Sequence, residues 1–378
     1  MSNMHTNSVL RQGQRGVTLV ELMISLLLGL LLTAGVIQVF AGNRFTYAFN
    51  EGLSRIQENA RFSLDHIAYS ARMAGYSGCL SEVAIHNNLD GAENIFRDDI
   101  ETGIQGHDAD GTGTDDIYVA GAVGFPLWTP ALPPELNNGA IPGSDVMPGS
   151  DVLIVRGLSG NSNSLVSPFN SSTQLITAEP HDFMAGEILV VSDCQKASIF
   201  QLTSVTGSGS AVNLEHSDTV GFTPGNDDAA WDAEQDYGLG SEIARLETYA
   251  FYVGEDDDGR PALFQLRLAR QSGTASSFAA EELVSGIDTM QVRYGLDADN
   301  DGAIDDLGLV TADAVAADAW TDVVSVEVTL LARSTDEYGA ETDEADYNVG
   351  GTTRFDPVDD RRLRQVFSTT IGVRNRLP

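Results

Sequence analysis

Residues Leu22 to Gly42 form an uncharged, strongly apolar run of 21 residues near the start of the chain. At a rise of about 1.5 Å per residue, a helix of this length is about 30 Å long, which matches the hydrocarbon core of a bilayer. A polar leader, residues 1–16, precedes the run and contains Arg11 and Arg15 but no acidic residue. This charge distribution favours a cytoplasmic N-terminus, so we expect one membrane span followed by a periplasmic head.

The segment Gly16-Val17-Thr18-Leu19-Val20-Glu21-Leu22 joins the leader to the apolar run. It resembles the class III signal of type IV prepilins, in which a glycine at the cleavage site precedes the only glutamate of the apolar stretch. The resemblance implies that prepilin peptidase cleaves between Gly16 and Val17 and that the amine of Val17 is then N-methylated. Val17 departs from the Phe or Met that family members commonly carry. A secretory signal cleaved at Ala41-Gly42 is the alternative, but the apolar stretch of such a signal is shorter than the run of 21 residues found here.

Glu21 is the only carboxylate beside the predicted span. An unpaired charge in a membrane helix costs about 2.5–3.5 kcal/mol on insertion scales, and less near the interface, so we expect a partner for it. Cleavage after Gly16 would create one, because the amine of Val17 would lie one helical turn away, in the same or a neighbouring subunit. We therefore assign Glu21 a role in assembly; the alternative is an interfacial glutamate with no such role.

A helical pattern continues beyond the apolar run. Apolar residues recur at spacings of three and four, at Phe45, Phe49, Leu53, Ile56, Ala60, Leu64, Ile67 and Ala71. This period is typical of a helix that packs one face on a core. Because Gly75 and Gly78 end the pattern, we predict one helix from Thr18 to Ala74. Its first half would be membrane or filament core, and its second half would pack on a globular head.

After Gly78 the pattern changes to short or alternating apolar runs bounded by Gly, Pro, Asn and Asp, which is typical of β-strands. The predicted strands are 116–123, 151–156, 187–192, 198–205, 246–253, 262–269, 289–295, 322–332 and 365–373. The strict alternation in 322–332 indicates a half-buried antiparallel strand. The predicted fold class is α+β and pilin-like, with a long N-terminal helix packed on an antiparallel β-rich head of two sheet lobes.

Breaks in composition divide the chain into six predicted segments. They are the leader 1–16, the membrane or filament-core helix 17–42, its amphipathic extension 43–78, a first β-rich lobe 79–206, an acidic Gly/Ser-rich linker 207–242 and a second β-rich lobe 243–378. The linker is predicted from its density of Gly, Ser and Asp, which favour loops.

The chain is strongly acidic, with 21 Lys plus Arg against 55 Asp plus Glu and a formal charge of −34. We therefore expect no direct binding of nucleic acid by charge neutralisation. The sequence contains no CxxC zinc pair, HExxH helix, GxSxG elbow or Walker loop. Since these motifs carry zinc, nucleophilic and phosphate chemistry, we expect no enzyme activity and no cofactor of those kinds.

The second lobe resembles the PilW-type minor pilins. The matching segments are Glu282–Ile287, Met290–Gly295, Trp320, Arg361–Phe367 and Val373–Asn375. The resemblance implies a minor pilin that enters a type IV pilus at or near its tip and helps to start assembly. Its expected partners are prepilin peptidase, the inner membrane, other minor pilins, the major pilin and a tip adhesin. The arginines of the ending, Arg361, Arg362, Arg364, Arg374 and Arg376, also suggest a basic patch for an acidic partner surface.

Two other functions share parts of this pattern. A minor pseudopilin of a type II secretion system has the same kind of N-terminal signal and apolar helix, although its head is usually smaller. A membrane-anchored periplasmic binding domain would keep its anchor uncleaved. The mature N-terminus and the co-purifying proteins separate these alternatives.

Cys79 and Cys194 are the only cysteines of the chain. Both would lie in the oxidising periplasm, where disulfides form and persist. We therefore expect one disulfide that ties the end of the helix to the first lobe.

The segment Asp297 to Asp305 places carboxylates at alternate positions before a glycine, as in the first half of an EF-hand calcium loop. The candidate ligands are Asp297, Asp299, Asp301 and Asp305. Gly308 stands where that pattern has a bidentate Glu, so we expect weak affinity. A solvated acidic turn is the alternative.

Overall fold

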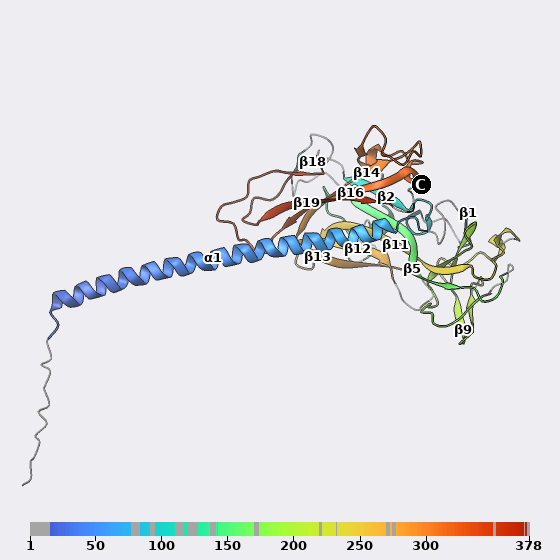
Figure 1. Ribbon diagram of the computed structural model, residues 1–378, viewed down its shortest axis with the longest axis horizontal. Coiled ribbons are helices and arrows are strands. Elements are labelled where there is room, and N and C mark those ends of the chain that lie inside the picture. Colours follow the sequence, from blue (N-terminus) through green and yellow to red (C-terminus); the bar gives the residue numbers. More distant parts are fainter. Residues whose placement is uncertain are drawn as a thin grey trace, which may run out of the picture. The chain divides into compact units, whose positions relative to one another are not determined.

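The computed structural model describes residues 16–76, 84–90, 95–109, 117–119, 128–136, 141, 143–169, 174–218, 221–231, 233–269, 273, 277–350, 353–373 and 375. The chain divides into two compact units, Met1–Glu51 and Gly52–Pro378, each described below by itself. Figure 1 shows its elements, a long helix α1 followed by many strands. The α+β class predicted from the sequence is confirmed.

Helix α1 runs from Leu19 to Arg72, close to the predicted bounds. Thr18 precedes it, and its Oγ1 accepts a hydrogen bond from the backbone N–H of Glu21 at 3.3 Å. A threonine followed three residues later by a glutamate is a helix-start signal, because the hydroxyl satisfies an N–H that has no partner within the helix.

The second part of α1, from Gly52 onward, buries one face in the head. The buried residues are Gly52, Ile56, Ala60, Ser63, Leu64, Ile67, Ala68, Ser70 and Ala71. Most of them are small, which lets strands approach the helix backbone. At Gly52 the approach is closest, since an added Cβ would lie 2.6 Å from Cδ2 of Tyr338. Thus only glycine fits at this point of α1 without moving the ring.

The large sheet has the strand order β1-β8-β7-β11-β5-β2-β4, with β12 paired to β11 and β13 paired to β12. The bounds are β1 (Ala84–Asn87), β2 (Ile104–Ala109), β4 (Trp128–Thr129), β5 (Val152–Ser164), β7 (Ile188–Ser192), β8 (Lys196–Gln201), β11 (Glu242–Glu255), β12 (Pro261–Leu268) and β13 (Phe278–Ser285). All pairs but β1–β8 are antiparallel.

A second antiparallel sheet has the order β15-β14-β16-β19. Its strands are β14 (Ile287–Leu296), β15 (Leu309–Val310), β16 (Val323–Arg333) and β19 (Arg364–Gly372). Two small sheets contain β3 (Ile117–Val119), β6 (Gln174–Thr177), β9 (Ser204–Ser208), β10 (Ala211–Glu215), β17 (Tyr347–Val349) and β18 (Thr353–Asp356). The short helices are α2 (Ile95–Asp98), η1 (Pro134–Leu136), η2 (Asp228–Ala230), η3 (Ala233–Gln235), η4 (Ala312–Ala314) and η5 (Trp320–Asp322).

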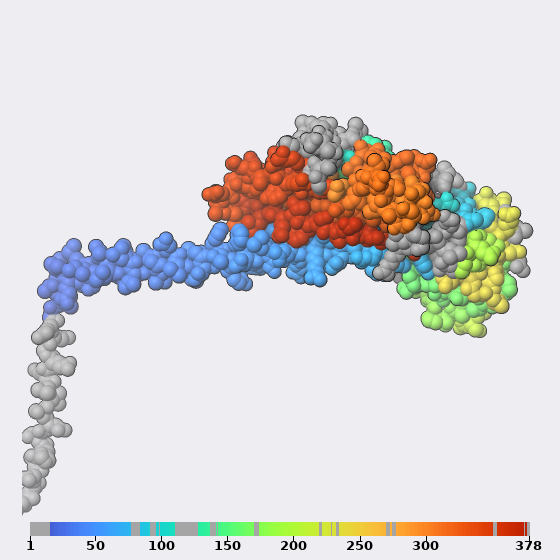
Figure 2. Space-filling view, turned by 45° about the horizontal axis from the view of Figure 1, so that its top comes forward, coloured from blue at the N-terminus to red at the C-terminus, as the bar shows by residue number. Residues whose placement is uncertain are grey.

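The main hydrophobic core lies between α1 and these two larger sheets. It joins Ile56 and Ile67 of the helix to Phe251 of β11, Val292 of β14 and Val328 of β16. Figure 2 shows the orange and red C-terminal part of the chain lying along the lighter blue part of α1. The helix is therefore a structural part of the head from Gly52 onward.

The predicted lobe boundary falls within connected structure. Strand β11, which follows the predicted linker 207–242, pairs with β5 and β7, which precede it. The linker itself contains the strand β10 and the short helices η2 and η3. The two-lobe boundaries stay a prediction, and one sheet shares strands from both sides of them.

Candidate functional site

The predicted cleavage site lies in a segment without regular secondary structure before α1. Gly16, Val17 and Thr18 are exposed, and no heavy atom lies within 4 Å of a Cβ placed on Gly16. The side chain of Val17 is 66% exposed. Residues 1–15, including Arg11 and Arg15, are outside the described residues. An exposed peptide outside helices and strands is accessible to a peptidase, and cleavage after Gly16 remains a prediction.

Glu21 lies in the first turn of α1. A carboxylate there interacts favourably with the free N–H groups and the positive end of the helix dipole. The uncleaved chain has no amine at Val17, so the pairing of Glu21 with that amine remains a prediction. The position in the first turn is compatible with it, since Val17 and Glu21 are four residues apart.

From Leu22 to Gly42, α1 is exposed on all its faces. Its most apolar window of 18 residues has a mean hydropathy of 2.3 and no buried residue, so by length and composition it can cross a membrane. The few hydroxyls donate back to the helix: Ser25 Oγ to the carbonyl of Glu21, and Thr33 Oγ1 to that of Gly29. Because these groups are internally bonded, the surface suits lipid or other apolar helices.

The PilW-like segments lie in the second sheet, in η5 and at the end of β13 that leads into β14. Gly286 turns β13 into β14 with a φ of +83°, and a Cβ there would lie 2.7 Å from the carbonyl oxygen of Arg333. Met290–Gly295 forms the middle of β14, where Tyr294 is fully buried. Trp320 of η5 meets the Tyr294 ring edge-on, with centroids 5.0 Å apart. These segments therefore shape the core under the second sheet.

Asp151 links the large sheet to the second sheet. Its Oδ1 accepts a hydrogen bond from the N–H of Ala109 at 3.0 Å, and its Oδ2 accepts one from the N–H of Val292 at 2.8 Å. Burial raises the pKa of Asp151 well above its ordinary value, and the nearby charge of Asp108 adds to the shift. One side chain thus joins β2 to β14 across the head.

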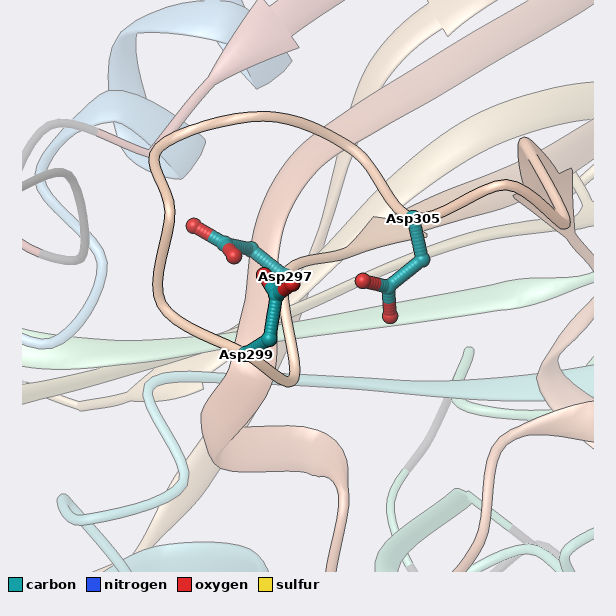
Figure 3. Close-up of side chains that lie close together, drawn as sticks. All are labelled: Asp297, Asp299 and Asp305. Atoms are coloured by element: carbon teal, nitrogen blue, oxygen red, sulfur yellow. The ribbon is translucent and has the colours of Figure 1, made fainter.

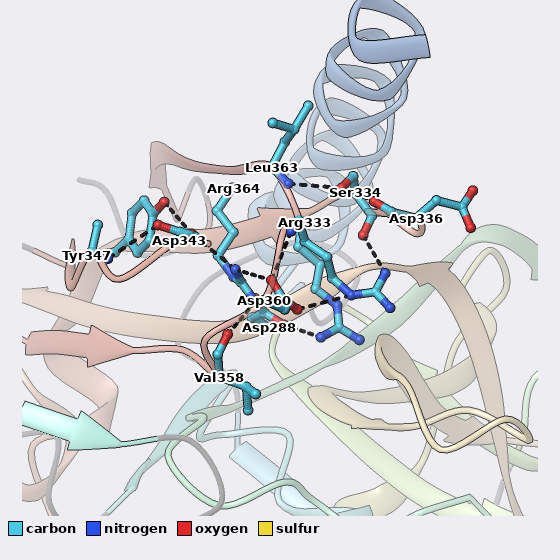
Figure 4. A network of polar contacts seen from close by, with 12 residues as sticks. Asp288, Arg333, Ser334, Asp336, Asp343, Tyr347, Val358, Asp360, Leu363 and Arg364 are labelled. Carbon is cyan, nitrogen blue, oxygen red and sulfur yellow. Dashed lines mark hydrogen bonds and ion pairs between the residues drawn. The ribbon is translucent and has the colours of Figure 1, made fainter. Parts of the chain in front are cut away.

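Arg364 is the centre of a buried ion-pair network (Figure 4). Its side chain is 1% exposed and lies 2.8 Å from Asp288, 3.1 Å from Asp343 and 2.8 Å from Asp360. Arg333 reaches the other oxygen of Asp288 at 3.2 Å. A buried arginine is stable only when its hydrogen bonds and charge are matched, as they are here.

The pKa values in this network follow from burial and pairing. Burial raises the pKa of Asp288, and the charges of Arg333 and Arg364 oppose that rise. Burial alone would lower the pKa of Arg364, but hydrogen bonds and charge from Asp360 and Asp288 raise it above its ordinary value. The network therefore keeps Arg364 charged and fixes the long connection between β16 and β19.

The predicted basic patch at the ending is wrong for the two arginines whose pairing is described. Arg364 is enclosed by carboxylates, and Arg362 donates to the carbonyl of Ser334 and pairs with Asp360 at 3.2 Å. Arg361 is exposed, while Arg374 and Arg376 lie outside the described residues. Arginines that are consecutive in sequence thus serve internal pairing as well as the surface.

Three of the four predicted calcium ligands come together (Figure 3). One carboxylate oxygen from each of Asp297, Asp299 and Asp305 lies within 4.8 Å of the others. Asp301 is outside this group, and its Oδ1 accepts a hydrogen bond from the N–H of Ala303. Asp297 accepts bonds from the N–H groups of Asp301 and Gly302 at 3.0 and 2.9 Å.

The carboxylates of this turn change one another's pKa, and hydrogen bonds within the turn also hold it. The charge of Asp301 is the main cause that raises the pKa of Asp299. Closely spaced carboxylates with such mutual repulsion favour either a proton or a cation. Calcium binding at this loop remains a proposal, because hydrogen bonds within an acidic turn would form without a cation as well.

Only one of the two cysteines of the predicted disulfide lies among the described residues. Cys194 lies in the turn between β7 and β8 with a φ of +70°, and Cys79 is outside the described residues. The pairing of the two cysteines therefore remains a prediction.

Comparisons with known protein families match two regions of the chain, one at the N-terminus and one in the C-terminal half. Residues 250–375 match the family model of Type IV Pilus-assembly protein W, and residues 11–37 match that of the Prokaryotic N-terminal methylation motif. No curated protein and no solved structure matches the chain. The first match covers β12 to β19 and the Arg364 network, and the second covers the cleavage segment and most of the apolar helix. A prepilin signal and a PilW region in one chain support a type IV minor pilin of the PilW family.

Proposed function

We propose that this minor pilin occupies the tip of a type IV pilus, or a position near it, where it helps to initiate assembly and to present tip components. The observation that carries the proposal is the combination of a prepilin signal with a PilW region packed on the same helix. The N-terminal signal implies processing by prepilin peptidase and assembly with other pilins. Its neighbours in the filament and a tip adhesin are the proposed partners.

The proposed mechanism is a transfer of α1 from one apolar environment to another. Before assembly the segment Leu22–Gly42 would lie in the inner membrane with the head in the periplasm, as the basic leader favours. During assembly the same exposed surface would pack against apolar helices of other subunits. Since the exposed apolar area is similar in both states, lipid can be exchanged for protein without exposing the helix to water. The head would then act by contact, and we propose no catalytic step.

Position in the pilus tests the tip proposal. An epitope tag in an exposed turn such as Glu255–Gly259, detected with gold-labelled antibody, should mark pilus ends and not the shaft. Deletion of the protein should lower the number of pili per cell more than their length, because an initiator acts once per filament. Gold distributed evenly along the shaft would contradict the tip proposal but would leave the protein a pilin.

The pseudopilin alternative predicts different co-purifying proteins. A type IV minor pilin should co-purify with pilus subunits after membrane solubilisation, whereas a pseudopilin should co-purify with components of a type II secretion system. An uncleaved, anchored binding domain should co-purify with neither and should keep its leader.

A further inference from the structure

Strand β19 forms a long edge of the second sheet. In the described part of the chain it pairs only with β16, over nine consecutive positions without a register shift. The N–H of Ser334 donates to the carbonyl of Leu363, and the N–H of Val373 donates to the carbonyl of Val324, at 2.8 and 2.9 Å. Because hydrogen bonding alternates along an antiparallel ladder, the odd-numbered residues of β19 direct their backbone groups toward β16.

The even-numbered residues of β19 direct their backbone groups away from β16. Of these, Ser368, Thr370 and Gly372 are exposed, and Val366 is half-buried. Within the described residues, their outward N–H and C=O groups have no backbone hydrogen bond. β19 therefore presents a row of donors and acceptors to solvent.

This edge lacks the features with which proteins normally prevent strand addition. Residues 365–373 contain no charged residue and no proline, in a chain of which 20% is charged. Five of the nine are β-branched: Val366, Thr369, Thr370, Ile371 and Val373. Exposed edges are usually short, bulged, charged or interrupted by proline, because otherwise they pair with other chains.

The edge strand β13 of the large sheet shows the contrast within the same head. β13 carries the exposed acids Glu281 and Glu282, and its pairing with β12 shifts register between Leu263 and Phe264. Glu281 also pairs with Arg267 at 3.1 Å. Charge and a bulge thus protect β13, while residues 365–373 of β19 have neither.

We propose that β19 is a β-augmentation site, to which a strand of a different pilus subunit adds along the free edge. Main-chain hydrogen bonds would supply affinity, and the side chains that meet Ser368 and Thr370 would supply specificity. The inference rests on the proposed function, since it names how a pilus neighbour binds this head.

Charge selects a different subunit over a second copy. Each copy carries a formal charge of −34, so two copies repel one another. Near the start of β19, the connection from β16 carries the exposed acids Asp336, Glu337, Glu341 and Glu344. Its Gly339 N–H donates to the carbonyl of Arg361 at 2.7 Å, which places these acids close to that end of the strand. The partner strand is therefore uncharged along its length and basic at the end that meets this connection.

Substitutions at the free edge test the proposal in the full-length protein. Thr370→Pro removes an outward N–H, and Thr370→Lys adds a charge to the edge, while neither removes a backbone hydrogen bond to β16, because Thr370 faces Glu327 at a non-hydrogen-bonded position. Gln365→Lys is the matched control, because Gln365 is exposed on the same strand but directs its backbone toward β16. Both Thr370 variants should lower the amount of this protein in sheared pili about tenfold, relative to its amount in membranes, and the control should match wild type.

Amide hydrogen exchange and cross-linking give a second readout. The amides of Ser368, Thr370 and Gly372 should exchange rapidly in protein extracted from membranes and slowly in assembled pili. A photo-reactive residue at position 370 should link the head to another subunit.

The outcomes separate the two proposals. Wild-type protein absent from pili would overturn the proposed function and the inference with it. If wild-type protein is present in pili, normal incorporation of folded Thr370 variants, or amides that stay unprotected there, would overturn the inference alone. A cross-link between two copies of this chain would overturn the assignment of a different partner.

Discussion

The two parts of α1 differ sharply although they belong to one continuous helix. Between Leu19 and Glu51 apolar side chains are exposed on every face, and Leu32 is 72% exposed. From Gly52 to Arg72 the buried residues follow one face, and Ile67 is fully buried. The same backbone thus serves two different surroundings.

The difference shows which contacts the head itself supplies. The second part of α1 buries its apolar face within its own chain, because strands of the head cover that face. Within the first part, the segment from Leu22 to Gly42 is apolar all round, which requires lipid or other helices around it. A chain built this way is stable as a membrane protein and as a filament subunit.

The largest expected effect concerns the junction before the first part. Gly16→Phe should leave the full-length precursor in the membrane and remove the protein from pili, because a bulky side chain would occupy the cleavage position. Gly29→Ala, within the same helix, should be processed normally. Immunoblots of membrane and pilus fractions measure both, and normal processing of Gly16→Phe would refute the prepilin assignment of this segment.

Glu21→Ala should separate insertion from assembly. Removing the carboxylate lowers the cost of insertion, so the amount in membranes should be unchanged or higher, while incorporation into pili should fall. Glu51→Ala serves as a control for the loss of an acid farther along α1. Incorporation of Glu21→Ala at the wild-type level would show that pairing with the Val17 amine has no role.

The predicted disulfide should hold the end of the second part to the head. In the chain-entropy model, closing a loop of about 115 residues contributes about 4–5 kcal/mol to the free energy of unfolding. Under denaturing, non-reducing conditions a thiol reagent should label neither Cys79 nor Cys194, and Cys79→Ser should expose one labelled thiol. Labelling of both cysteines in the wild type would exclude the bond.

Truncation of one apolar residue in each part sharpens the comparison directly. Ile67→Ala should lower the free energy of unfolding by about 2–5 kcal/mol, because it leaves a cavity in the main core. Leu32→Ala should not change it, since the side chain of Leu32 is 72% exposed and its truncation leaves no cavity in the main core. Urea unfolding in detergent, followed by tryptophan fluorescence, measures both, and equal effects would contradict the division of α1.

The smallest expected effect is that of calcium on the head. Millimolar calcium should raise the melting temperature by a few degrees, because the proposed site has few ligands and weak affinity. Asp299→Ala should abolish the rise, and Asp257→Ala in another acidic turn should retain it. The same rise in both variants would assign the effect to general screening of the acidic chain.

The periodicity of the sequence predicted α1, and each of the nine predicted strands overlaps a strand of the structure. Elements such as the second part of α1, β11 and β16 were predictable because their apolar residues recur with the period of a buried face. β13 was missed since Glu281 and Glu282 interrupt its alternation at an exposed edge. β2 was missed because Gly106 replaces an apolar side chain; a Cβ there would collide with Tyr294. Both are features of tertiary packing that local sequence does not contain.

For the candidate site, local spacing identified three of the four aspartates that lie close together, with calcium binding still a prediction, whereas long-range ion pairs were not predicted. Asp297, Asp299 and Asp305 are close in sequence and in space. Arg364, in contrast, pairs with Asp288, which is 76 residues away in the sequence, so Arg364 was mistaken for part of a surface patch. Buried ion pairs between residues that are distant in sequence can be recognised only once the fold is known.

The intact mass of the protein isolated from sheared pili tests the central claim most directly. The account predicts a single species that begins at Val17, carries one added methyl group and lacks residues 1–16. Absence of the protein from pili, or a species that retains the leader or begins after Gly42, would contradict it.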